Sequence, residues 1–343
     1  MSTAPPTRVV VVEDSPVQRA HIVAVLQATG QITVVAEAAD VPGALEAVRT
    51  HRPQLVTMDL ELPGGITSEL GGVEAIRTIM AERPTPILVL SVHTPSRESG
   101  EALVALDAGA IDVLPKASAG DGAAAETLRR RVRVLSGVPM VRRPRATAPV
   151  PTARVTDLPV IALAASTGGP GALRTVVAEL RGVGAPVLVV QHIHAEFVES
   201  FARWLQETTL MPVTVPGHRE AARPGVVYVA PADTHLRLGP GRTLELDPEP
   251  ELLSRPSADE LLSSVAAHAG PAAVGAVLTG MGDDGARGLL AIRQAGGRTF
   301  AQDGESATVD GMPRAARDLG AAERVMGLEQ IGRSIAAIAA GGR

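Results

Sequence analysis

The residues best placed for chemistry follow a short apolar run and precede a helix-like stretch. Residues 160–165 are all Val, Ile, Leu or Ala, and Ser166-Thr-Gly-Gly-Pro170 comes directly after them. A hydroxyl at such a strand-to-helix turn is held at the carboxyl end of a sheet, beside free backbone N–H groups. Those N–H groups can bind a phosphate or the oxyanion of an acyl-transfer intermediate. The turn alone leaves both chemistries open, and also a purely structural connection.

A histidine follows the next apolar run. This run covers residues 185–191, and His192-Ile-His194 follows it directly. A histidine at the carboxyl end of a parallel strand can act as general base for a neighbouring serine. The two histidines would also share one face of a strand, as in half of a metal site, but the chain has no Cys and no third ligand at a telling spacing.

A pair of carboxylates follows a third apolar run, residues 273–279. The segment Gly280-Met-Gly-Asp283-Asp284-Gly leads into a helix pattern. Either aspartate could cap that helix, and either could instead hold an imidazole in the right tautomer. Because sites of open α/β folds lie at the carboxyl ends of their strands, the three runs together predict a Ser–His–Asp arrangement.

Residues 158–340 resemble the catalytic domain of the chemotaxis protein-glutamate methylesterases. Six stretches in chain order carry the resemblance: 165–170, 190–192, 255–259, 279–285, 301–303 and 311–316. The resemblance implies a triad of Ser166, His192 and Asp284, with His194 and Asp283 as the neighbouring alternatives.

The implied reaction is acyl transfer to water. Ser166 would attack the γ-carbonyl of a methylated glutamate, methanol would leave, and water would hydrolyse the acyl-enzyme. The backbone N–H groups at Thr167 and, by resemblance, Met281 would bind the oxyanion. An amide carbonyl accepts the same attack, so the enzyme could also deamidate receptor glutamine.

Three further residues resemble a family element near the active site. Arg255, Ser257 and Asp259 are candidate substrate contacts. The alternative is structural, because Ser257 also stands where it could cap a helix over residues 258–268.

The first part of the chain alternates apolar runs with helix-like stretches, which predicts a doubly wound parallel sheet. Helices are expected at about 17–29, 41–50, 72–82, 97–108 and 121–135. The apolar runs end in acidic, hydroxyl or basic residues: Glu13, Asp14, Asp59, Ser91 and Lys116. Carboxylates gathered in this way suit Mg²⁺.

This pattern resembles the receiver domain of two-component response regulators. The resemblance implies that Glu13, Asp14 and Asp59 bind Mg²⁺ and that Asp59 is phosphorylated by a histidine kinase. It makes Ser91 the switch hydroxyl and Lys116 the phosphate contact. The sequence departs from the family in a loop after Asp59 that is about five residues longer, and in Ala117, where receivers usually have proline.

The length of 343 residues favours two domains. We expect a receiver at 7–136, a Pro- and Arg-rich linker at 137–157 and a catalytic domain at 158–340, both domains being parallel-sheet α/β folds. The net charge of -5 argues against nucleic-acid binding. No apolar run approaches the roughly 20 residues of a membrane span, and no signal-like start is seen, so a cytoplasmic protein is expected.

Two local predictions concern the catalytic domain. Segments 226–230, 235–238 and 243–246 are expected as strands that add an antiparallel edge to the parallel sheet. Phe197, Phe201 and Trp204 have helical spacing, which predicts a core-facing side of a helix.

The predicted function is a phosphorylation-regulated methylesterase acting on chemoreceptor glutamates. By resemblance, the unphosphorylated receiver covers the active site and phosphorylation at Asp59 releases it. Two alternatives stay open: a receiver-containing adaptor or phosphate sink without catalysis, and a methylesterase for a protein outside chemotaxis.

Overall fold

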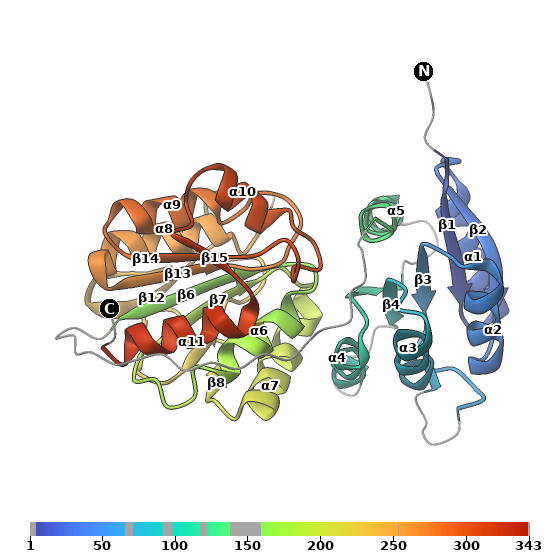
Figure 1. Ribbon diagram of the computed structural model, residues 1–343, viewed down its shortest axis with the longest axis horizontal. Helices are drawn as coiled ribbons and strands as arrows, with labels where there is room; N and C mark the ends of the chain where they lie inside the picture. The colour runs from blue at the N-terminus through green and yellow to red at the C-terminus, as the bar shows by residue number, and fades with distance from the viewer. Residues whose placement is uncertain are drawn as a thin grey trace. The chain divides into compact units, whose positions relative to one another are not determined.

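The computed structural model describes residues 5–65, 71–91, 98–116, 122–137, 159–252 and 254–341. The chain divides into two compact units, Met1–Arg142 and Arg143–Arg343 (Figure 1). The predicted linker lies outside the described residues except for Gly137, as do Ala117 and part of the long loop after Asp59. Among the described helices, none has the length and apolar character needed to cross a membrane.

The first unit is built on a five-stranded parallel sheet with strand order β2-β1-β3-β4-β5. Its strands are β1 (Thr7–Val12), β2 (Ile32–Ala38), β3 (Leu55–Met58), β4 (Ile87–Ser91) and β5 (Asp112–Pro115). Its helices are α1 (Pro16–Gln27), α2 (Val41–His51), α3 (Gly71–Glu82), α4 (Glu98–Ala108) and α5 (Gly122–Leu135). The central strands are buried on both sides, as their continuous apolar runs require. The five predicted helices are all present, with ends shifted by at most two residues.

The second unit is built on a seven-stranded parallel sheet of order β15-β14-β13-β6-β7-β10-β8. Its strands are β6 (Val160–Ala165), β7 (Val187–Gln191), β8 (Val213–Thr214), β10 (Val227–Val229), β13 (Ala273–Val277), β14 (Arg298–Gln302) and β15 (Arg324–Met326). Its helices are α6 (Gly169–Ala178), α7 (Val198–Thr209), α8 (Ala258–Ala269), α9 (Ala286–Gln294), α10 (Met312–Asp318) and α11 (Leu328–Ala339). In Figure 1, α8, α9 and α10 cover one face of this sheet and α6, α7 and α11 the other.

The predicted antiparallel edge is wrong in its placement. The hairpin of β11 (His235–Leu238) and β12 (Thr243–Asp247) exists, but with β9 (Glu220–Ala221) it forms a separate three-stranded sheet. Strand β10, which was grouped with it, instead lies parallel to β7 in the large sheet. The reason is burial: Leu236, Leu238 and Leu244 point into a core shared with α8, so the hairpin packs on a helix rather than extending a sheet edge.

The core-facing position predicted for Phe197, Phe201 and Trp204 is confirmed. Phe201 is fully buried, and Phe197 and Trp204 are 6 % and 8 % exposed. The guanidinium of Arg174 lies 5.9 Å from the centroid of the Trp204 ring, so the edge of this core carries a cation–π contact.

Candidate active site

The register of the large sheet brings three strand ends together. Strand β6 lies between β7 and β13, with Ala165 opposite Gln191 and Ala164 opposite Val277. The next residues along β6 and β7 are Ser166 and His192, so the serine and the histidine end neighbouring strands. On the other side, the N–H of Ser166 donates to the carbonyl of Thr279 at 3.0 Å. From β6 the chain adds β7 on one side of the sheet and later β13 on the other. The site lies at this point, where the order of strand addition changes side, which is the usual position of ligand sites in such folds.

A tight turn holds Ser166 at the start of α6. Gly168 has a φ of 75°, in the left-handed region that glycine tolerates. The N–H of Gly169 then donates to the carbonyl of Ser166 at 2.8 Å. Glycine is also needed at position 280, because a Cβ there would lie 2.2 Å from the sulfur of Met312 and 2.8 Å from the Cβ of Ser166. These glycines let the loop after β13 close against the turn that carries the serine.

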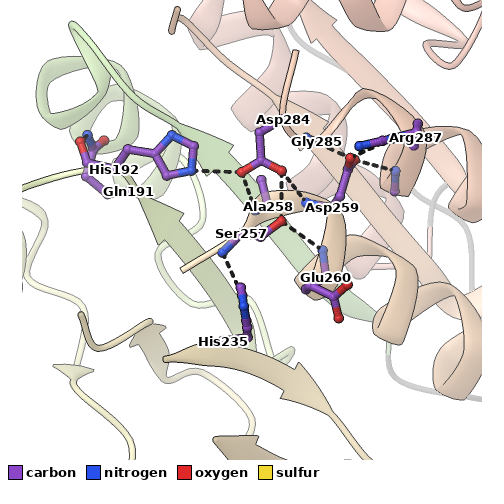
Figure 2. A network of polar contacts seen from close by, with 11 residues as sticks. Gln191, His192, His235, Ser257, Ala258, Asp259, Glu260, Asp284, Gly285 and Arg287 are labelled. Carbon is purple, nitrogen blue, oxygen red and sulfur yellow. Dashed lines mark hydrogen bonds and ion pairs between the residues drawn. The ribbon is translucent and has the colours of Figure 1, made fainter. Parts of the chain in front are cut away.

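The predicted base and carboxylate are hydrogen-bonded. His192 Nε2 lies 2.9 Å from Asp284 Oδ2, as Figure 2 shows. His194 and Asp283 are exposed, and His194 pairs with Glu196 instead, so neither neighbour takes part in this contact. The imidazole of His192 therefore contacts Asp284 through Nε2 and not through Nδ1.

Ser166 is buried, with 4 % of its surface exposed. Within the described part of the chain its Oγ makes no hydrogen bond. Hydrogen bonds between a nucleophile and its base are often long without substrate and shorten in the complex. The register still places the serine beside the histidine.

The Asp284 carboxylate is stabilised in its charged form. Burial alone would raise its pKa, but the hydrogen bond and charge of His192 and the N–H groups of Ala258 and Asp259 together lower it. Ser257 adds a hydroxyl donor at 2.9 Å. A carboxylate held in this way stays ionised and can fix the imidazole and stabilise its protonated form.

The three candidate substrate contacts are engaged within the protein. Ser257 caps α8, accepting from the N–H of Glu260 at 3.4 Å, and also donates to Asp284. Asp259 accepts from two N–H groups at the start of α9 and pairs with Arg287 at 3.0 Å. Arg255 donates to the carbonyl of Pro248 at 3.4 Å.

The alternative role of the aspartates before α9, capping that helix, is not observed. Neither Asp283 nor Asp284 caps α9, whose N-cap is Gly285. Asp284 accepts from the first turn of α8, and Asp259 of α8 accepts from the first turn of α9. The two helices lie close together, so each receives its cap from the other's segment.

Two buried side chains without a predicted role contact the site. The amide Nε2 of Gln191 donates to the carbonyls of Ser166 at 2.8 Å and of His192 at 3.0 Å. His235 accepts the N–H of Ser257 on Nδ1 at 3.0 Å. A polar residue at the end of an apolar run was the available signal for Gln191, whereas nothing in the sequence pattern pointed to His235.

The second candidate site lies at the carboxyl edge of the first unit's sheet. Carboxylate oxygens of Glu13, Asp14 and Asp59 all lie within 4.8 Å of one another. Glu13 and Asp59 are buried and Asp14 is exposed, which suits Mg²⁺, an ion that takes few carboxylates and keeps several waters. Lys116 Nζ lies 2.8 Å from Asp59 and 2.9 Å from Glu13. The buried Ser91 accepts the N–H of Lys116 on its carbonyl, so the structure gathers all five predicted residues.

One lysine offsets part of the negative charge in this pocket. Burial raises the pKa of Glu13. Burial would lower the pKa of Lys116, but its hydrogen bonds and charge interactions with Asp59 and Glu13 outweigh this and raise it. The ammonium group therefore remains charged beside the two acids.

Comparison with known proteins identifies both units. The CheB methylesterase family model matches residues 161–335, and the response regulator receiver domain model matches residues 9–125. The chain belongs to the CheB methylesterase family. It is thus an enzyme of the protein-glutamate methylesterase class that carries a receiver domain, and the resemblance found in the sequence is confirmed.

Individual relatives extend over nearly the whole chain. This CheB methylesterase is 43 % identical to protein-glutamate methylesterase/protein-glutamine glutaminase 3 of Anaeromyxobacter dehalogenans, covering 96 % of this chain and 98 % of that relative. It is 41 % identical to the protein-glutamate methylesterase FrzG of Myxococcus xanthus, covering 86 % and 88 %. The CheB methylesterase catalytic domain of Thermotoga maritima is similar in structure, with a TM-score of 0.51 at 31 % identity, over 53 % of this chain and all of that one. The predicted parallel α/β fold class is confirmed.

The lowered pKa of Asp284 predicts how the stability of this CheB methylesterase depends on pH. The carboxylate titrates near pH 3.9 in the unfolded chain and lower in the folded one. Its contribution to stability is therefore complete above about pH 4 to 5 and is lost as the pH falls through the folded pKa. Asp284→Asn should lower the melting temperature of the catalytic unit near neutral pH, and the difference from wild type should shrink in acid. Calorimetry between about pH 7 and pH 2.5 checks this, and a difference that does not change with pH contradicts it.

Proposed function

We propose that this chain hydrolyses glutamate γ-methyl esters on chemoreceptors and that phosphorylation of Asp59 controls the reaction. The observation that carries the proposal is the hydrogen-bonded pair of His192 and Asp284 beside the buried Ser166, at the carboxyl ends of neighbouring strands.

In the proposed mechanism Ser166 is the nucleophile. Its Oγ attacks the γ-carbonyl carbon as His192 takes the hydroxyl proton. The N–H groups of Thr167 and Met281 stabilise the oxyanion of the tetrahedral intermediate. The intermediate collapses with loss of methoxide, which takes the proton from His192 and leaves as methanol. Water activated by the same imidazole then hydrolyses the acyl-enzyme and frees the glutamate and the serine.

The orientation of the ring decides which nitrogen acts as base. Asp284 accepts the proton on Nε2 of His192, so the lone pair is on Nδ1. In the usual serine protease arrangement the carboxylate holds Nδ1 and Nε2 is the base. We assign the opposite use of the ring here. Proton transfer works in the same way in both arrangements, because either ring nitrogen can transfer a proton while the carboxylate stabilises the imidazolium.

The same site also supports deamidation. A glutamine amide carbonyl accepts the same attack, and the leaving group is then ammonia. Several similar proteins are named protein-glutamate methylesterase/protein-glutamine glutaminase, which favours this second activity. Chemoreceptor cytoplasmic regions are the proposed partners, and the enzyme would act in the cytoplasm.

Mass spectrometry of receptor peptides tests the proposed activity. A purified chemoreceptor fragment carrying both glutamate methyl esters and glutamines is incubated with the enzyme and digested. Loss of one CH₂ unit at the methylated glutamates supports the methylesterase, and conversion of glutamine to glutamate supports the glutaminase. If neither changes while the fragment still binds, a non-catalytic adaptor is favoured; if another methylated protein is processed instead, the receptor substrate is wrong.

The receiver is the proposed regulatory input. Asp59 would accept a phosphoryl group from a histidine kinase, with Mg²⁺ held by Glu13, Asp14 and Asp59. When bound, the ion neutralises charge on the phosphoryl oxygens. Lys116, already in contact with Asp59, would then contact the phosphoryl group, and Ser91 would respond to it. The phosphoryl group must favour the active state of the esterase over the inactive one for any switching to occur.

Asp59→Asn tests this regulation. In wild type, a small phosphodonor with Mg²⁺ is expected to raise the rate of methanol release. In Asp59→Asn the rate is expected to stay at its unstimulated value, because an amide is not phosphorylated in place of the carboxylate. Asp112→Asn is the matched control, since it changes an aspartate on β5 that pairs with Arg131 rather than with Lys116. Equal stimulation of Asp59→Asn and wild type refutes the assignment.

A further inference from the structure

We propose that Ser257, held in place by the buried His235, is a positioning residue of the esterase. Its hydroxyl fixes the rotation of the Asp284 carboxylate, and the carboxylate in turn fixes the ring of His192. This inference rests on the proposed function for its kinetic consequence, but its structural consequence is independent of any substrate.

The Asp284 carboxylate receives four donors, two on each oxygen (Figure 2). Oδ2 accepts from His192 Nε2 at 2.9 Å and from the N–H of Ala258 at 2.8 Å. Oδ1 accepts from the hydroxyl of Ser257 and from the N–H of Asp259, both at 2.9 Å. Rotation of the carboxylate would break bonds on both oxygens at once. Among the residues that the structure describes, Ser257 supplies the one side-chain donor on Oδ1, the oxygen that does not contact His192.

Ser257 is itself fixed from behind. It is 2 % exposed, and its N–H donates to Nδ1 of His235 at 3.0 Å. His235 lies on β11, is fully buried, and its Nε2 lies 2.9 Å from the carbonyl of Pro250. With Nδ1 accepting and Nε2 donating, both ring nitrogens of His235 are used in the neutral form. A continuous path of hydrogen bonds thus joins the separate antiparallel sheet to the catalytic histidine.

Hydrogen bonds from the first turn of α9 to Asp259 of α8 fix the backbone that follows Asp284. Asp259 Oδ1 accepts from the N–H groups of Gly285 at 3.0 Å and Gly288 at 2.8 Å. Gly285 directly follows Asp284, so the aspartate is tied to α8 through its side chain and through the next residue of its backbone. This fixed frame gives the single hydroxyl of Ser257 a defined geometry, as positioning groups around active sites require.

Ser257→Ala and Ser264→Ala provide a matched test. Ser264 is also on α8, and its hydroxyl accepts from the N–H of Leu238 at 2.9 Å without contacting Asp284. Both variants should lower the melting temperature by a few degrees. Well below that temperature, Ser257→Ala should lower kcat for methanol release roughly 10-fold to 100-fold with little change in KM, because a hydrogen bond to a charged group is lost. Ser264→Ala should keep the wild-type kcat, and Ser257→Thr, which keeps a hydroxyl, should recover much of the loss.

Nitrogen NMR of the histidine rings gives the decisive readout without a substrate. The ring signals of His192 in the full chain labelled with ¹⁵N-histidine are assigned by their loss in His192→Gln. Wild type and Ser264→Ala should show the Nε2-protonated tautomer, whereas Ser257→Ala should show a mixture of tautomers. A wild-type ring spectrum and wild-type kcat in Ser257→Ala would overturn the proposal. If wild type itself releases no methanol, the proposed function fails, and the ring spectra alone still decide the positioning role.

Discussion

Ser166→Ala is expected to lower methanol release by about 10⁴-fold to 10⁶-fold, because no other group can form the acyl-enzyme. The side chain is buried at a turn where Gly280 leaves just enough room for it, so alanine fits without strain. Binding of the methylated receptor should be retained, since the loss falls on the chemical step. The rate is measured as volatile methanol released from receptor fragments that carry labelled methyl esters.

Ser200→Ala is the control for this change. Ser200 is a buried serine of the same unit whose hydroxyl donates to the carbonyl of Phe197 at 3.1 Å. It should lose some stability and keep the wild-type rate well below its melting temperature. If both serine variants lose activity equally, the effect of Ser166→Ala is one of folding, and the role of nucleophile is unsupported.

Asp284→Asn is expected to lower kcat by about 10⁴-fold. The amide is nearly the size of the carboxylate but carries no charge, and its NH₂ group would face donors wherever it points. It therefore neither holds the Nε2-protonated ring of His192 nor stabilises the imidazolium. Steady-state kinetics at neutral pH, with circular dichroism to confirm the fold, measures the effect.

Asp283→Asn is the natural comparison, because Asp283 precedes Asp284 directly and is exposed. It should retain the wild-type kcat, because substitutions of exposed side chains outside such contacts usually have small effects. The opposite outcome, with Asp283→Asn inactive and Asp284→Asn active, would falsify the assignment of the carboxylate.

Much of the fold follows from local patterns. The apolar runs that we interpreted as buried strands are strands, and the helix-like stretches predicted between the strands of the first unit are helices. The position of the hairpin could not be predicted. Apolar and polar residues alternate in β11 and β12, which shows that one face of the hairpin is buried but not which element covers that face. Here α8 covers it rather than a neighbouring strand.

The candidate site divides in the same way. That a serine, a histidine and an aspartate meet at one edge could be predicted, because parallel strands align their carboxyl ends. The choice of His192 and Asp284 over His194 and Asp283 followed from the family resemblance. The donors to Asp284 could not be predicted, since helix α8 approaches from a segment far along the chain. Local rules left open that an aspartate caps the helix that follows it, whereas in the structure Asp284 accepts from the first turn of α8 and Asp259 from the first turn of α9. Long-range pairing of this kind leaves no periodic signal in the sequence.

Methanol release from methylated receptor fragments, with and without a small phosphodonor and Mg²⁺, tests the central claim most directly when wild type and Ser166→Ala are compared. The account predicts release by wild type that rises with the phosphodonor, and release by Ser166→Ala that is about 10⁴-fold or more slower in either condition. Release by Ser166→Ala at a rate close to that of wild type would contradict it.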